Sequence, residues 1–294
     1  MRIFIVANPD KPDVRPTLDH WLPRLNQLAQ VVGIDTDQNS DLAQVDADAI
    51  LVLGGDGTLL SVARRIDGRP IPLMGVNFGR LGFLASFTPD EFTQSLDQFV
   101  TGRLPISRRQ VIQTCVVAAD SPCQILDPDD VHRKRRFMAT ALNDAVITAG
   151  PPFHMIELEL EVDGQSSVRY FGDGVIVATP SGSTAYNISA GGPIVIPGVD
   201  ALCITPICPH SLSFRPVVIS SNSTVLIVAQ RVNPGTTLFC DGQENTRLQA
   251  GDKVIIRKNP NPVLLIENPR EYQWRSLADK LHWAVSPAHG PSIR

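Results

Sequence analysis

The stretch Gly54-Gly55-Asp56-Gly57-Thr58 decides the fold that this sequence predicts. An apolar run at 49–53 precedes it and predicts a buried strand, and the residues from Thr58 to Arg65 predict the start of a helix. A glycine-rich turn between a strand and a helix exposes backbone N–H groups, which suits a phosphate or a dinucleotide. The Asp56 carboxylate repels phosphate, so its presence indicates a separate task as helix cap, general base or metal ligand.

Strand and helix signals alternate in residues 1–105, and this alternation is typical of an α/β domain with a parallel sheet. The predicted strands lie at 2–7, 31–34, 49–53 and 71–76, and helices are predicted near 15–30, from Thr58 onward and from Pro89 to Val100. A second glycine turn, at 77–84, follows the strand at 71–76. Both turns are therefore expected at carboxyl ends of strands, where ligands of such sheets bind.

Residues 106–270 change character, because strand-like runs dominate and turns separate them. This part is expected to form an all-β domain, and it includes one continuous strand-like run at 137–148. The basic run Arg133–Arg136 beside acidic residues is interpreted as a solvated hairpin tip. Residues 271–294 are expected to form a C-terminal tail with a helix from about 271 to 283.

The composition is that of an ordinary soluble globular protein, with 43% apolar and 19% charged residues over 294 positions. The net charge of −4 gives no general case for binding nucleic acid or a membrane surface. The sequence contains no apolar run near the ~20 residues that span a bilayer. Its five cysteines are odd in number and include no CxxC, which argues against a disulfide framework or a zinc knuckle. A reducing, cytoplasmic setting is therefore expected.

Further candidate binding residues lie in the β-rich part. They occur in Asn143-Asp144, in Phe171–Gly174 with Asp173, in Thr179–Asn187 with the following Ile188 and Ser189, and in Asp241-Gly242-Gln243. Small residues allow a ligand to approach the backbone, and hydroxyls with a Tyr ring suit an amide, a ribose or an aromatic base. The sequence lacks GxxxxGK[ST], a spaced His/Cys/Glu set and G-x-S-x-G, which argues against a Walker site, a tight transition-metal site and a hydrolase elbow.

In their order, these spaced motifs resemble the bacterial NAD kinase family over roughly residues 1 to 270, and the Thr179–Asn187 run is the most specific of them. The resemblance implies an N-terminal α/β domain and a C-terminal all-β domain with the active site between them. It implies Mg²⁺-dependent phosphoryl transfer from ATP, or from polyphosphate in some members, to the adenosine-ribose 2′-hydroxyl of NAD. It also implies a homo-oligomer, a dimer or a tetramer.

The resemblance further implies roles for single residues, but it leaves the residues that bind the metal unknown. Asp56 is implied as the general base, with Gly54, Gly55 and Thr58 on the phosphate side, where ATP binds. The implied NAD-binding residues are Asp56, Gly57, Asn143, Asp144, His154, Asp173, Thr184, Ala185, Tyr186, Asn187, Ile188, Ser189 and Gln243. Gln243 is expected to close the far side of the pocket from a neighbouring subunit or a β-turn. Phe171 departs from the family pattern, in which many members carry Arg.

Two other functions stay open from the sequence. Lipid kinases share the Gly-Gly-Asp-Gly turn, although the Thr179–Asn187 run and Asn143-Asp144 argue against them. A non-catalytic dinucleotide sensor would use the same pocket without turnover. The sequence leaves open the choice between NAD and NADH, the range of phosphoryl donors, feedback by NADP(H) and the size of the oligomer.

Overall fold

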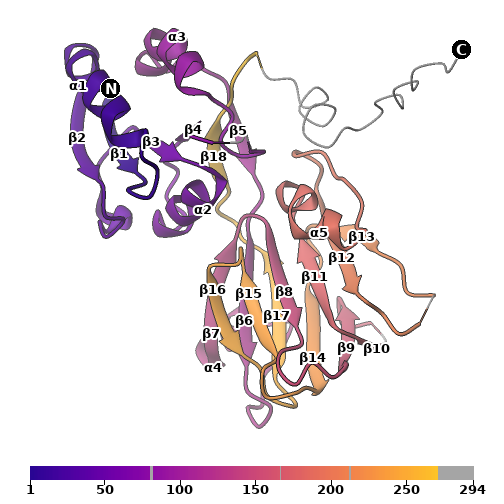
Figure 1. Ribbon diagram of the computed structural model, residues 1–294. Coiled ribbons are helices and arrows are strands. Elements are labelled where there is room, and N and C mark those ends of the chain that lie inside the picture. Colours follow the sequence, from indigo (N-terminus) through magenta and orange to yellow (C-terminus); the bar gives the residue numbers. More distant parts are fainter. Residues whose placement is uncertain (80–81, 166, 212, 271–294) are drawn as a thin grey trace, which may run out of the picture.

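The computed structural model describes residues 1–79, 82–165, 167–211 and 213–270, so the helix predicted at 271–283 lies outside the described residues. The chain forms an α/β domain and a β-sandwich, and the α/β domain lies at one end of the sandwich (Figure 1). The chain enters the sandwich after residue 109 and returns to the first domain before residue 263. None of the helices in the described ranges is long and apolar enough to cross a membrane.

A six-stranded sheet in the order β2-β1-β3-β4-β18-β5 forms the centre of the first domain. Its strands are β1 (Arg2–Ala7), β2 (Gln30–Asp35), β3 (Ala49–Gly54), β4 (Leu73–Asn77), β5 (Ile106–Arg109) and β18 (Val263–Ile266). All of them run parallel except β5, which is antiparallel to β18. All six residues of β3 are buried, as expected for a central parallel strand covered on both faces. The predicted parallel α/β fold is confirmed.

Helices cover both faces of this sheet (Figure 1). α1 (Val14–Leu28) and α3 (Pro89–Val100) pack on one face, around Trp21 and Phe92. α2 (Asp56–Arg65) and the short 3-10 helix η1 (Leu42–Gln44) pack on the other face. α3 begins with a capping box, in which Thr88 and Glu91 bond each other's backbone N–H groups.

The second domain is a sandwich of two six-stranded sheets whose inner faces share one apolar core. The first sheet has the order β10-β9-β14-β17-β6-β7, with β6 (Ile112–Val117), β7 (Arg135–Ala141), β9 (Ile156–Val162), β10 (Val168–Gly172), β14 (Val225–Arg231) and β17 (Lys253–Lys258). The second has the order β13-β12-β11-β8-β15-β16, with β8 (Asp144–Thr148), β11 (Gly174–Ala178), β12 (Ala201–Ile207), β13 (Val217–Ser220), β15 (Thr237–Cys240) and β16 (Glu244–Arg247). Three short helices are attached to the sandwich: α4 (Pro128–Lys134), η2 (Ser181–Thr184) and α5 (Tyr186–Ser189).

Three details differ from the sequence prediction. Residues 106–270 do not all belong to the all-β domain, because β5 and β18 pair within the sheet of the first domain. The continuous strand-like run at 137–148 is divided into β7 and β8, which belong to different sheets because the chain bends at 142–143. The hairpin tip predicted at Arg133–Arg136 is wrong, since the run spans the end of α4 and the start of β7. The helix forms because Asp127 caps it through the N–H of Asp129 at 2.9 Å, with Pro128 in its first turn.

Candidate active site

Asp56 begins α2 directly after β3, and its side chain does not cap its own helix. The carboxylate instead accepts backbone N–H groups of the second glycine turn, from Phe83 at 2.9 Å, Leu84 at 3.3 Å and Ala85 at 2.9 Å. Gly82 permits this approach, because a Cβ at that position would lie 2.1 to 2.3 Å from the carboxylate atoms. The two glycine turns that the sequence predicted at one edge of the sheet therefore meet at Asp56.

A cavity of about 450 Å³ opens at the N-terminus of α2, beyond the carboxyl ends of β1, β2 and β3. Every lining residue is polar or glycine: Asn8, Lys11, Gln38, Gly55, Gly57, Thr58, Ser61, Arg64 and Gln243. The Thr58 side chain packs against Gly54, and its hydroxyl accepts a hydrogen bond from the Asn8 amide at 3.0 Å. The exposed N–H groups of a helix N-terminus and the positive charges of Lys11 and Arg64 make this cavity suitable for an anion such as a phosphate chain.

Five residues of this cavity were missed by the sequence analysis: Asn8, Lys11, Gln38, Ser61 and Arg64. Two signals could have found most of them. Asn8 and Lys11 follow the first strand, and Gln38 follows the second, so all three lie at the ligand-binding edge of the sheet. Ser61 and Arg64 lie four and seven residues after Gly57, a spacing that places them on one face of the helix.

On the sandwich side, the turn at 142–144 is held by the half-buried carboxylate of Asp241. Asp241 accepts the backbone N–H groups of Leu142 at 2.8 Å, Asn143 at 2.7 Å and Asp144 at 3.2 Å. The Oδ1 atom of Asn143 is buried and has no hydrogen-bond partner among the described residues. A buried acceptor without a partner is costly, so this atom is suited to receive an N–H or O–H group of a ligand.

Asp144 itself lies 5% exposed at the start of β8. Burial, together with the negative charge of nearby Asp241, raises the pKa of Asp144 to about 7, and the backbone N–H of Tyr186 opposes this rise. Burial also raises the pKa of Asp241, although its three backbone N–H bonds and Arg64 act in the opposite direction. At neutral pH the Asp144 carboxyl can therefore both donate and accept a hydrogen bond.

The Thr179–Ser189 segment packs directly against this turn. The Thr179 hydroxyl donates to the carbonyl of Leu142 at 2.5 Å, and Gly182 leaves no room for a Cβ, which would lie 2.0 Å from the carbonyl oxygen of Asn143. Tyr186 is 47% exposed, and its neighbours Thr184, Ala185, Ile188 and Ser189 are half-buried or exposed. The segment that carries these side chains therefore lies against Asn143, and the backbone N–H of Tyr186 bonds Asp144.

Asn187, in the same segment, has a different environment. It is fully buried, and its amide donates to the carbonyls of Ser183 and Pro193, each at 3.0 Å. Its Oδ1 accepts the Thr205 hydroxyl at 2.6 Å. Because its polar atoms are bonded within the protein, Asn187 fixes the shape of the segment that carries Tyr186.

Gln243 joins the two halves of the site within one chain. Its Nε2 donates to the carbonyl oxygen of Gly57 at 2.8 Å, and its Oε1 accepts from Arg64 at 2.5 Å. It lies in the turn between β15 and β16 of the same chain. A β-turn was one of the two locations expected for it, and a neighbouring subunit was the other.

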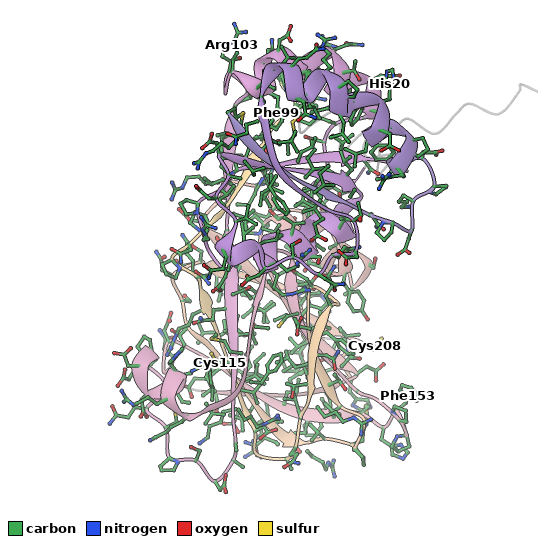
Figure 2. All side chains as sticks on the ribbon, turned by 90° about the vertical axis from the view of Figure 1, so that its left-hand side faces the viewer. His20, Phe99, Arg103, Cys115, Phe153 and Cys208 are labelled. Atoms are coloured by element: carbon green, nitrogen blue, oxygen red, sulfur yellow. The ribbon has the colours of Figure 1, made fainter. Side chains whose placement is uncertain are left out.

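His154 and Asp173 lie apart from this cluster. Asp173 precedes Gly174 at one end of β11, whereas Ala178, at the other end, pairs with Asp144. Its backbone bonds Ile207 and Ala149. His154 is exposed and follows Phe153, which lies at the end of the sandwich away from the α/β domain (Figure 2). A single chain therefore presents the predicted NAD-binding residues in two separate groups.

Within the described ranges, no group of three or more His, Cys, Asp or Glu side chains is arranged to hold a metal ion. The side chains that surround the cavity at α2 carry amide and hydroxyl oxygens, from Asn8, Thr58 and Ser61 among others. Oxygen atoms of this kind and phosphate oxygens are the ligands that Mg²⁺ prefers. The donor set of the cavity therefore fits Mg²⁺ that is bound to phosphates.

Two family models match the chain, the ATP-NAD kinase N-terminal domain at residues 25–104 and the ATP-NAD kinase C-terminal domain at residues 142–268. An NAD kinase from Syntrophotalea carbinolica is 40% identical over 259 residues, which cover 87% of this chain and 86% of that protein. The chain belongs to the ATP-NAD kinase family. An NAD kinase from Rhodopirellula baltica, 33% identical over 96% of this chain and 87% of that protein, agrees with this placement. The family predicted from the spaced motifs is confirmed.

Two solved structures match the fold of this chain over most of its length. An NAD kinase from Archaeoglobus fulgidus, solved in complex with ATP, matches with a TM-score of 0.74 and 26% identity, covering 96% of this chain and 99% of that one. The yeast NADH kinase, solved with NADH, matches with a TM-score of 0.85 at 23% identity, covering 98% of this chain and 89% of that one. The second match supports the fold alone.

Proposed function

We propose that this chain is an NAD kinase, which transfers the terminal phosphoryl group of ATP to the 2′-hydroxyl of the adenosine ribose of NAD. The observation that carries the proposal is the position of Asp56. It lies at the start of α2, whose N-terminus opens into the phosphate-suited cavity, and the adjacent Gly57 is tied through Gln243 to the turn that bears Asn143 and Asp144. Membership of the ATP-NAD kinase family supports the same reaction.

In the proposed reaction, the ribose 2′-oxygen attacks the γ-phosphorus, the bond from that phosphorus to the bridging oxygen breaks, and ADP leaves. The hydroxyl proton passes to the carboxylate of Asp56. Among the described residues, Oδ2 of this carboxylate accepts one N–H and Oδ1 accepts two, so Oδ2 retains a lone pair for the hydroxyl. The backbone N–H groups of 83–85 hold the carboxylate in one orientation, which favours a fixed approach of the ribose.

On the donor side, we assign the phosphates of ATP to the cavity at α2, in contact with Gly55, Gly57 and Thr58. Gly54 lies behind them, against the Thr58 side chain. Lys11 and Arg64 supply positive charge next to the transferred group. Bound with these phosphates near the oxygen donors Asn8, Thr58 and Ser61, Mg²⁺ would supply neutralisation of the charge that develops during transfer. Polyphosphate presents the same chemical group to this cavity and is included as a candidate donor.

On the acceptor side, we assign NAD to Asn143, Asp144 and the surface of Thr184–Ser189. The unpartnered Asn143 Oδ1 is the acceptor for an N–H or O–H group of the dinucleotide. The exposed Tyr186 ring offers an apolar face for a base. Asn187 supports this surface from within rather than by contact.

We further propose that a second copy of the chain completes the NAD site, because Asp173 and His154 lie at the far end of the sandwich. The strands β10 and β13 are edge strands of the two sheets, and residues of both line one cavity. Both edges expose apolar side chains, at Val168 (51% exposed), Val217 (53%) and Val218 (50%). An exposed apolar patch of this kind marks a protein interface. We therefore propose that the protein is a homo-oligomer, a dimer or a tetramer, in the cytoplasm, as the sequence predicted.

The test is to incubate the purified chain with NAD, Mg²⁺ and either ATP or polyphosphate, and to measure NADP enzymatically. Asp56→Asn should lower kcat by about 10²- to 10⁴-fold, the usual contribution of general-base catalysis. Asp19→Asn, at an exposed carboxylate of α1, is the matched control. If the wild-type chain forms no NADP with either donor but binds NAD, the sensor alternative replaces the kinase. If Asp56→Asn retains the wild-type rate, the general-base role is wrong.

A further inference from the structure

The turn between β15 and β16 has a rigid backbone. Asp241 and Gly242 both adopt left-handed conformations, with φ of 51° and 66°, and the N–H of Gln243 donates to the carbonyl of Cys240 at 3.0 Å. Two consecutive residues with positive φ make a tight turn, for which Asp-Gly is strongly favoured, and Cys240 pairs with Glu244 across its three residues. The side chains of Asp241 and Gln243 are therefore carried by one short, well-defined unit.

Each of these two side chains holds a different half of the site. The Asp241 carboxylate accepts all three backbone N–H groups of 142–144, the acceptor-side turn. The Gln243 amide holds α2 at two places, through the Gly57 carbonyl at 2.8 Å and the Arg64 guanidinium at 2.5 Å. Arg64 also pairs with Glu244 at 3.2 Å, one residue beyond the turn. The contacts span two domains and residues far apart in the sequence.

We infer that the Asp241–Gln243 turn is the positioning joint between the donor and acceptor halves of the site, and that Gln243 acts through Gly57 and Arg64 rather than on NAD. This inference rests on the proposed function and deepens it. Both polar ends of the Gln243 amide are engaged within the protein. Gly57 directly follows the proposed base, Asp56, so a displacement of its peptide moves the base and the phosphate-facing N–H groups together.

The geometry explains why such a joint is needed. The proposed reaction brings a hydroxyl held by the sandwich into line with a phosphoryl group held by the α/β domain. A misplacement of about 1 Å in such a transfer costs about 10²-fold in rate. Among the described residues, Asp241 and Gln243 fix the separation of the two halves through one hairpin. The chain crossings near 110 and 260 and packing contacts, such as those between α2 and β7, also connect the domains.

The experiment compares Gln243→Met, a variant of similar size without the hydrogen bonds, with wild type. Gln230→Met is the matched control, because Gln230 is an exposed glutamine of β14 whose amide bonds Glu159 on the sandwich surface. Steady-state kinetics give kcat and the KM values for NAD and ATP. Amide hydrogen exchange of the peptide at 54–62 reports on the first turns of α2 without requiring activity.

For Gln243→Met we expect kcat to fall about 10- to 100-fold, with both KM values within about threefold of wild type and faster exchange at 54–62. The control should match wild type in all readouts. A tenfold rise in the KM for NAD at unchanged kcat would show that Gln243 binds NAD, and an unchanged kcat and KM would show that it positions nothing. Either result overturns the inference. If the wild-type chain proves inactive, the proposed function is wrong, whatever the result for Gln243. In that case, unchanged hydrogen exchange at 54–62 in Gln243→Met shows that the Asp241–Gln243 turn does not position α2.

Discussion

The buried carboxyl group of Asp144, beside the half-buried Asp241, leads to a prediction about pH. In the unfolded chain Asp144 loses its proton near the ordinary value of 3.8, whereas in the folded chain burial and Asp241 raise the pKa to about 7. Between these two values the folded state binds more protons than the unfolded state, so the free energy of unfolding falls as pH rises from about 4 to 7. At about 1.4 kcal/mol for each pH unit, the loss amounts to about 4 kcal/mol.

The perturbation is Asp144→Asn, which keeps the shape of the side chain and removes its titration. The variant and the wild type should differ little near pH 4, and the variant should be more stable by about 4 kcal/mol at pH 8. Urea unfolding without nucleotide, measured at half-unit steps from pH 4.5 to 8, follows this difference, with Asp19→Asn as the control. A difference that stays constant across the range within 1 kcal/mol would refute the assignment of a raised pKa to Asp144.

Three further outcomes are expected. Gly82→Ala places a Cβ within 2.1 to 2.3 Å of the Asp56 carboxylate, so kcat should fall about 10²-fold with KM values retained; a kcat within threefold of wild type would contradict the contact. Asn187→Ala removes three buried hydrogen bonds and should lower the free energy of unfolding by about 2 to 3 kcal/mol; lost NAD affinity at unchanged stability would place Asn187 on the ligand instead. Lys11 makes no side-chain hydrogen bond or ion pair with any described residue. Lys11→Ala should therefore raise the KM for ATP about tenfold, because the attraction for phosphate is lost. If steady-state kinetics show a changed KM for NAD instead, Lys11 does not bind the phosphoryl donor.

Local patterns in the sequence were sufficient to predict much of the fold. The alternation of strands and helices up to residue 105 predicted the parallel sheet, because each buried strand leaves a short apolar run between glycine turns. Because ligands bind at the carboxyl ends of parallel strands, the two glycine turns were expected at one edge of the sheet. In the structure they meet at Asp56. The spaced motifs predicted the family.

The remaining features depend on contacts between distant segments. β18 joins the first sheet from position 263, and four residues of strand carry no signal of which sheet they will enter. The pKa of Asp144 depends on its burial, on Asp241, which lies 97 residues later, and on the backbone N–H of Tyr186. The separation of His154 and Asp173 from the main cluster follows from the direction of β11, which the motif order does not reveal.

The position of β18 has a consequence for how the chain is made. β18 lies between β4 and β5, and β5 has no other strand partner in the sheet among the described residues. The first domain therefore cannot complete its sheet during synthesis until residue 266 has emerged, after the entire sandwich. Domains usually fold in order of synthesis, from the N-terminus onward. Here the sandwich, although later in the sequence, is the first unit whose sheets can be complete, and the α/β domain closes afterwards on its last strand.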